Sequence, residues 1–121
     1  MGDELSVTVR RERGVVIAAV TGDVDISTVA RLRECLFELA DSGRPLIVDL
    51  NRVTFIDSTG LGVLIAAARR AAGRGASVHA VCSRPQTRKL LWLTGVDRRI
   101  PLTATVDGAL TLLTASRDAP G

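Results

Sequence analysis

The apolar residues of this chain change their spacing several times, and that change most constrains the fold. Residues 5–9 and 15–20 have the pattern of strands, whereas residues 29–40 repeat apolar side chains every three or four positions, as one face of a helix does. The short apolar run Leu46–Leu50 then indicates a strand buried on both faces, and a second helical pattern follows and ends near Gly73. Strands that alternate with helices form βαβ units, which predicts a mostly parallel sheet.

The second half of the chain continues this alternation. The predicted elements there are a strand at 76–82, a helix at 85–94 with Pro85 in its first turn, an edge segment at 100–102, a helix at 106–113 and a frayed tail at 117–121. The first two strands are close enough along the chain to form an antiparallel hairpin at one edge. We therefore predict a single α/β domain over residues 1–121, with a core from about 5 to 116. It has a mixed, mostly parallel sheet, an N-terminal hairpin edge and about four helices.

Composition excludes several classes of protein. Hydrophobic residues make up 46% of the 121 residues and charged residues 24%, as in ordinary globular proteins. Aromatic residues make up only 2%, so the core must be aliphatic. No apolar run reaches the roughly 18 residues of a membrane span. Cys35 and Cys82 lack the spacing of metal ligands, and we interpret them as buried free thiols in a reducing cytosol. We expect a cytoplasmic protein without metal or cofactor.

The segment from Val53 to Gly62 is not explained by the fold alone. Asp57 and Ser58 precede the second helix, where serine is a favourable N-cap. Gly60 and Gly62 fall in the first turns of that helix, where each glycine costs roughly 1 kcal/mol relative to alanine. We infer that another group approaches the helix backbone closely at this point.

The start of the same helix is also a favourable place for negative charge. Free N–H groups and the positive end of the helix dipole both attract anions. A phosphate on Ser58 would add about −1.5 to −2 charges beside Asp57. Because the dipole tolerates that charge, we expect modification to change binding and to leave the fold intact.

Two segments resemble the motifs of a known family. The sequence FIDSTGLGVL at Phe55–Leu64 resembles the signature of the STAS domain family and, more narrowly, of the bacterial anti-sigma factor antagonists. Thr21–Asp25 resembles the second motif of that family, at the end of the second strand. The resemblance extends from about Leu5 to Ser116, in element order as well as in motif.

This resemblance implies a function in transcription regulation by partner switching. In such proteins the serine that matches Ser58 is phosphorylated by an anti-sigma factor, itself a serine kinase with an ATPase-type fold. The unphosphorylated antagonist binds and sequesters that kinase, which frees a sigma factor. Phosphorylation abolishes the binding, and a metal-dependent serine phosphatase restores it.

The resemblance also implies a site. Ser58 would be the phosphoacceptor, with Thr59 as a second candidate, and the helix over residues 60–72 would supply the contact face. We expect Val63 and Ala67 on the exposed side of that helix. The implied partner-binding residues are Asp23, Asp25, Asp57, Ser58, Thr59, Gly60, Gly62 and Val63.

Three alternatives remain beside this interpretation. An enzyme is disfavoured, because the lone His79 lies inside a predicted strand and Ser58 lacks the Gly-x-Ser-x-Gly turn of hydrolases. Direct nucleic-acid binding is disfavoured, because aromatic residues for base stacking are almost absent. A STAS interaction module of a larger signalling scaffold, not switched through a sigma factor, is the third. We expect no membrane association, and a monomer or weak dimer, since the hairpin edge leaves weak pairing open.

The third predicted helix is basic and carries the only tryptophan. We interpret its charges as a solvated face, which would equally suit an acidic protein partner. We expect Trp92, among leucines, to lie in the core. The basic residues of this region are Arg84, Arg88, Lys89, Arg98 and Arg99.

Overall fold

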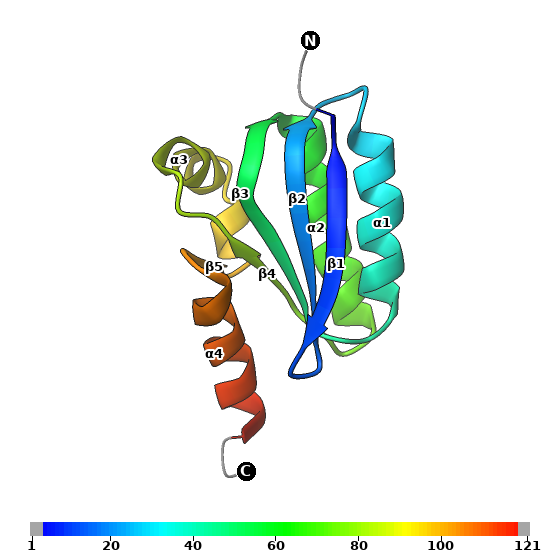
Figure 1. The fold of residues 1–121 in the computed structure, drawn as a ribbon, viewed down its shortest axis with the longest axis vertical. Coiled ribbons are helices and arrows are strands. Elements are labelled where there is room, and N and C mark those ends of the chain that lie inside the picture. Colours follow the sequence, from blue (N-terminus) through cyan, green and yellow to red (C-terminus); the bar gives the residue numbers. More distant parts are fainter. Residues whose placement is uncertain (1–3, 119–121) are drawn as a thin grey trace.

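Five strands form one mixed sheet in the computed structural model, which describes residues 4–118. The strands lie side by side in chain order, β1 antiparallel to β2 and the others parallel (Figure 1). Their bounds are β1 Ser6–Glu12, β2 Val15–Val24, β3 Leu46–Ile56, β4 Val78–Val81 and β5 Leu102–Thr103. The predicted parallel sheet with an N-terminal hairpin edge is confirmed.

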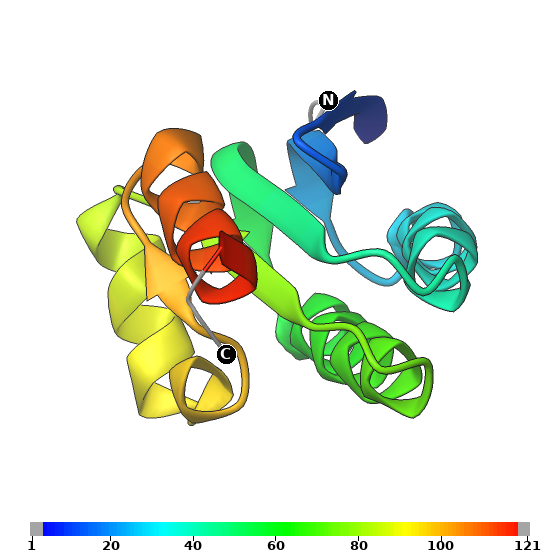
Figure 2. The same cartoon turned by 90° about the horizontal axis from the view of Figure 1, so that it is seen from below.

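Four α-helices cover this sheet on both faces, as predicted. Helices α1 and α2 lie side by side on one face, α4 packs on the other, and α3 lies at the far end of the molecule from α1 (Figure 2). The helices are α1 Val29–Asp41, α2 Ser58–Gly73, α3 Pro85–Leu93 and α4 Val106–Asp118, with a 3₁₀ turn η1 at Val96–Arg98.

The core divides into two parts because the central strands bury both faces. The larger part lies under α1 and α2 and includes Leu36 and Leu64, each fully buried. The smaller part lies under α4 and includes Ile17, Ile47 and Leu110. Burying an aliphatic side chain of this size stabilises the fold by roughly 1.5–3 kcal/mol. The aliphatic composition therefore suffices for a packed interior without aromatic residues.

An ion pair fastens α1 to α2 outside the core. Arg70 donates from Nε to Asp41 Oδ1 at 3.0 Å and from Nη2 to Asp41 Oδ2 at 2.5 Å. The same guanidinium lies 4.6 Å from the centre of the Phe37 ring. Arg70 thus joins a two-pronged ion pair to a cation–π contact.

Several predicted boundaries need correction. Strand β2 continues to Val24 and β3 to Ile56, beyond the predicted ends at residues 20 and 50. Strand β4 is shorter than predicted, and α4 extends through the predicted tail to Asp118, while residues 119–121 lie outside the described part. The two longer strands matter for function, because they carry the FIDSTGLGVL segment to one edge of the sheet.

The environment of Trp92 was predicted wrongly. Trp92 is 62% exposed, and Leu91 is the residue of α3 that reaches the core. An isolated helical turn shows which residues share a face, but the neighbouring elements decide which face is covered.

Cys82 is buried as expected, whereas Cys35 is only partly buried, and both thiols are free. Partial burial still raises the pKa of Cys35, which disfavours its reactive thiolate.

Candidate functional site

The candidate site lies where β2 and β3 end. These parallel strands pair Asp23 with Phe55 and Val24 with Ile56, so both strands end at the same edge of the sheet. A register shift between Gly22 and Asp23 accompanies this exit, and Gly22 has a φ of +100°, which favours glycine. The structure thereby brings Asp23, Asp25 and the start of α2 together, although 32 residues separate Asp25 from Asp57.

Asp57, and not Ser58, is the N-cap of α2. Its backbone is extended, and its Oδ1 accepts hydrogen bonds from the backbone N–H of Thr59 at 3.0 Å and of Gly60 at 3.3 Å. Thr59 Oγ1 also donates to the same oxygen, at 2.5 Å. That hydroxyl bond is the main reason that the pKa of Asp57 lies below its ordinary value of 3.8, although desolvation and the charge of Asp25 act in the opposite direction.

The cap distinguishes the two candidate phosphoacceptors. Ser58 is the first residue of α2, its side chain is exposed, and its hydroxyl forms no hydrogen bond within residues 4–118. The Thr59 hydroxyl is partly buried and bound to Asp57. The geometry favours Ser58, because a kinase would have to break the Thr59–Asp57 bond before it could use the threonine.

The loop after β2 is held by its own polar groups. Asp25 Oδ1 accepts from Ser27 Oγ at 2.6 Å and from the N–H groups of Ser27 and Thr28 at 2.9 and 3.2 Å. Thr28 Oγ1 in turn donates to the Asp23 carbonyl at 2.8 Å. The Ser27 hydroxyl is the main cause that lowers the pKa of Asp25. This Asx turn precedes α1 and stabilises the charged form of Asp25.

Asp23 is tied to the neighbouring strand. Thr54 Oγ1 donates to Asp23 Oδ1 at 2.5 Å. Thr54 is exposed on β3, just before Phe55. This bond fixes one carboxylate oxygen beside the start of α2. Sequence analysis missed Thr54, because its strand was predicted to end at Leu50.

The two glycines of the motif have different surroundings. A Cβ on Gly60 would lie 2.5 Å from Val24 Cγ1 and 2.8 Å from Ile56 Cγ1, closer than real Cβ atoms approach. The group that approaches this backbone is therefore the protein's own core. A Cβ on Gly62 would meet nothing within 4 Å, and Gly62 is exposed. Gly60 is thus a packing residue, and Gly62 leaves the surface beside Ser58 open.

The exposed face of α2 differs from the predicted one. Val63 is 3% exposed and Ala67 is fully buried, so neither faces a partner. Both lie among the side chains that pack α2 on the sheet, together with Leu64. The helix faces solvent at Ser58, Gly62, Arg69 and Arg70. Val63 is therefore withdrawn from the predicted partner-binding residues.

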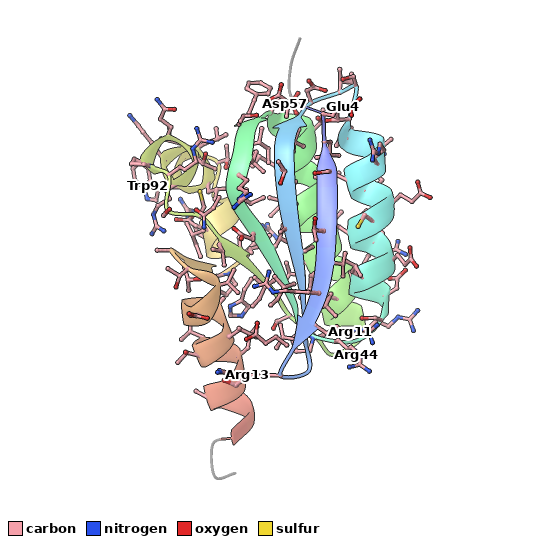
Figure 3. The ribbon with its side chains drawn as sticks, viewed as in Figure 1. Glu4, Arg11, Arg13, Arg44, Asp57 and Trp92 are labelled. Carbon is pink, nitrogen blue, oxygen red and sulfur yellow. The ribbon has the colours of Figure 1, made fainter. Side chains whose placement is uncertain are left out.

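Two exposed apolar side chains near this edge were missed. Ile26 is 81% exposed in the loop after β2, and Phe55 is 53% exposed near the end of β3. Exposed side chains of this size are favourable anchors for a partner protein. Phe55 pairs with Asp23 across β2 and β3, and Ile26 directly follows Asp25. Figure 3 shows Asp57 at the upper end of the molecule. We call Asp23, Asp25, Ile26, Phe55, Asp57, Ser58 and Gly62 the Ser58 surface.

Neither a metal centre nor a membrane helix is found in the described residues. Within residues 4–118, no group of three or more His, Cys, Asp or Glu side chains is arranged to hold a metal ion. No helix in the same range is long and apolar enough to cross a bilayer. His79 is buried in β4, 9% exposed, and its Nδ1 has no hydrogen-bond partner.

Comparison with known proteins decides the family. The model of the STAS domain matches residues 6–109. This chain belongs to the STAS domain family. The anti-sigma-F factor antagonist RsfB of Mycobacterium tuberculosis H37Rv is 34% identical over 110 residues, which covers 90% of this chain and 89% of RsfB. The anti-sigma-B factor antagonist of Bacillus subtilis is 27% identical over 106 residues, 88% and 97% of the two chains.

Solved STAS structures share the fold. The crystal structure of an anti-sigma factor antagonist from Mycobacterium paratuberculosis matches with a TM-score of 0.83 at 32% identity, over 95% of this chain and 96% of the other. The Bacillus antagonist SpoIIAA in its phosphorylated form matches with a TM-score of 0.68 at 20% identity, over 89% and 99%. The mixed sheet with four helices is therefore the STAS fold found in anti-sigma factor antagonists.

Proposed function

We propose that this STAS protein is an anti-sigma factor antagonist that is switched by phosphorylation of Ser58. In the unphosphorylated form it binds an anti-sigma factor serine kinase in the cytoplasm, and a sigma factor is thereby released. The observation that carries this proposal is the Ser58 hydroxyl at the first residue of α2, next to the cap Asp57: it is exposed and forms no hydrogen bond with the part of the chain that the structure describes. The names of the similar antagonists support it.

The chemistry of the switch requires only the exposed hydroxyl on this chain. The Ser58 Oγ attacks the γ-phosphorus of ATP bound to the kinase, ADP leaves, and the hydroxyl proton passes to a base on the kinase. A serine phosphatase then hydrolyses the phosphoserine to serine and inorganic phosphate. Neither reaction needs a catalytic group from this chain, which agrees with its proposed role as a binding protein.

The cost of burying a phosphate dianion in the contact explains why phosphorylation would abolish binding. The carboxylates of Asp23, Asp25 and Asp57 already make this surface acidic. A phosphate adds about −1.5 to −2 charges. Asp57 already accepts from the N–H groups of Thr59 and Gly60, so two donors at the helix start are not free to compensate the phosphate. The expectation of an open anion site at the helix start is corrected accordingly.

The partner surface can be described by complementarity. It should offer hydrogen-bond donors to the three carboxylates and apolar recesses to Ile26 and Phe55, with no cation placed to receive a phosphate on Ser58. Phosphorylation then introduces a dianion and added bulk between these contacts, where the exposed Gly62 leaves room for a closely docked partner. Modification thus weakens binding without requiring the fold to change.

A purified system with the cognate anti-sigma kinase tests the proposal. We expect phosphate transfer from labelled ATP to wild type and to Thr59→Val, and none to Ser58→Ala. In calorimetry, Ser58→Ala should bind the kinase like wild type, whereas Ser58→Asp should bind at least about tenfold more weakly. Because a carboxylate carries less charge than a phosphate, phosphorylation itself should weaken binding further.

Two further variants make this result specific. Arg44→Glu places a new acidic group at the opposite end of the molecule and should leave kinase binding unchanged (Figure 3). Phe55→Ser should weaken binding without preventing phosphorylation by excess kinase. Phosphate transfer to Ser58→Ala, or equal binding by Ser58→Ala and Ser58→Asp, would leave the scaffold module as the better interpretation.

A further inference from the structure

Helix α3 carries an apolar surface that the described fold leaves uncovered. Trp92 is 62% exposed and Leu93 is 63% exposed at the last turn of α3. Lys89 precedes them by three and four residues, so all three side chains share one face of the helix. Trp92 lies on the side of α3 that faces away from the sheet (Figure 3).

Two basic residues of this region serve the fold. The guanidinium of Arg84 donates to the carbonyl of Val53 on β3, and Arg88 Nη1 donates to the carbonyl of Cys82 at 2.7 Å. Both carbonyl groups lie at or near strand ends, so these bonds hold α3 against the sheet. These two arginines are therefore occupied.

Three other basic residues have no such role. Lys89, Arg98 and Arg99 are exposed, and none of them forms an ion pair within residues 4–118. Residues 84–99 contain five basic residues and one acidic residue, a net charge of +4. The other 11 basic and 12 acidic residues give −1, which accounts for the +3 of the whole chain. The excess positive charge is thus concentrated at α3 and η1.

A hollow adjoins this basic region. It has a volume of about 280 Å³ and lies between α2 and the end of η1, with Ile65, Ala68, Arg69, Ala72 and Arg99 around it. Three of these side chains are apolar. Arg69 is exposed and, like Arg99, forms no ion pair among the described residues. The hollow can therefore accept an apolar side chain with a carboxylate beside it.

We propose that Lys89, Trp92, Leu93, Arg98 and Arg99, which we call the α3 patch, form a second docking surface together with this hollow. Its partner is a protein that presents an acidic segment with apolar side chains. Tryptophan and arginine are the residues most often found at the energetic centre of protein interfaces. Opposite charge on the partner supplies complementarity to three unpaired cations.

The α3 patch is separate from the Ser58 surface. The Ser58 surface is acidic and lies at the ends of β2 and β3, whereas the α3 patch is basic and lies on α3 and η1, on the side of β3 that is away from β1 (Figures 1 and 3). The two surfaces therefore require partner groups of opposite charge. The α3 patch would therefore bind its partner in either phosphorylation state, so this inference does not depend on the proposed switch.

Peptide probes test the inference on the full-length protein. The first probe is a fluorescein-labelled peptide of about 16 residues, built from glutamate and leucine at helical spacing. The second has lysine in place of every glutamate. We expect the acidic peptide to bind, with affinity falling roughly tenfold between low salt and about 0.3 M salt. An unlabelled acidic peptide should shift the emission of Trp92, the only tryptophan, to shorter wavelength, and the basic peptide should leave that emission unchanged.

Matched variants decide which surface binds. Lys89→Glu/Arg99→Glu and Trp92→Ser should each weaken the acidic peptide roughly tenfold or more. Arg11→Glu/Arg44→Glu makes the same change in net charge at the opposite end of the molecule and should leave binding unchanged (Figure 3). Ser58→Asp should also leave peptide binding unchanged, although it weakens binding to the kinase. The failure of one proposal can therefore be distinguished from the failure of the other.

Four outcomes would overturn the inference. These are no binding of the acidic peptide by wild type, an equal shift of Trp92 emission by both peptides, an equal loss in the Arg11→Glu/Arg44→Glu control, or α3-dependent binding to phosphatidylglycerol vesicles without peptide binding. The last result would assign the α3 patch to a lipid surface. Circular dichroism confirms that each variant is folded before its binding is interpreted.

Discussion

Replacing Gly60 by alanine tests how closely the first turn of α2 packs on the strand ends. The new Cβ would lie 2.5 Å from Val24 Cγ1 and 2.8 Å from Ile56 Cγ1. Both neighbours are β-branched and buried, 0% and 6% exposed, so neither can rotate away freely. Such overpacking costs roughly 1–3 kcal/mol, against a gain of up to about 1 kcal/mol from the helix propensity of alanine. Two contacts this short place the cost in the upper part of that range, about 2–3 kcal/mol, so we expect a net loss of about 1–2 kcal/mol in the free energy of unfolding.

Gly62→Ala is the matched control, because its Cβ meets nothing within 4 Å. There the helix propensity acts alone and should add about 0.5–1 kcal/mol of stability. Urea unfolding followed by far-ultraviolet circular dichroism measures both variants, since the exposed Trp92 is a weak reporter of the core. The two variants should shift the urea midpoint in opposite directions. A Gly60→Ala protein as stable as wild type would refute the close packing of α2 on β2 and β3.

Three further predictions concern individual side chains. Asp57→Ala removes the acceptor for three hydrogen bonds at the start of α2 and should lower the melting temperature, whereas Ser58→Ala should leave it nearly unchanged. Equal melting temperatures of the two variants would mean that the cap does not stabilise the helix. Arg70→Met removes the ion pair with Asp41 and should lower the melting temperature at low salt; an undiminished difference in about 1 M salt would contradict an electrostatic origin. Burial lowers the pKa of His79 below 6.5, so the unfolded chain takes up this proton first, and stability should decline as pH falls below about 6.5. In His79→Gln, the urea midpoint should change less between about pH 7 and pH 5 than it does in wild type. The same pH dependence of the midpoint in both proteins would exclude His79 as the cause.

The order of strands and helices could be predicted because the spacing of apolar residues depends only on a short segment of the chain. Alternation within residues 5–9, continuous apolar runs and three- or four-residue repeats each indicate one kind of element. Short connections between them leave few topologies other than a parallel sheet with an antiparallel hairpin edge. Strand ends were less predictable, because residues 51–56 are polar in part and become strand only by pairing with Thr21–Val24.

The site was predicted in part. The motif placed Ser58 and Asp57 at the start of a helix, but Asp57 became the cap because its carboxylate reaches two N–H groups and the Thr59 hydroxyl. Ile26 and Phe55 were missed, since an apolar residue beside a strand gives no local sign that it is exposed.

The sequence by itself determined which elements form and which residues share each helix face, because both depend on spacing along the chain. The tertiary structure alone decided which face is covered. Packing on the sheet buried Val63 and left Trp92 in solvent. It also brought the carboxylates of Asp23, Asp25 and Asp57 to one edge, through the pairing of parallel strands that lie far apart in the chain. Contacts between distant elements, which no local pattern encodes, therefore defined both the Ser58 surface and the α3 patch.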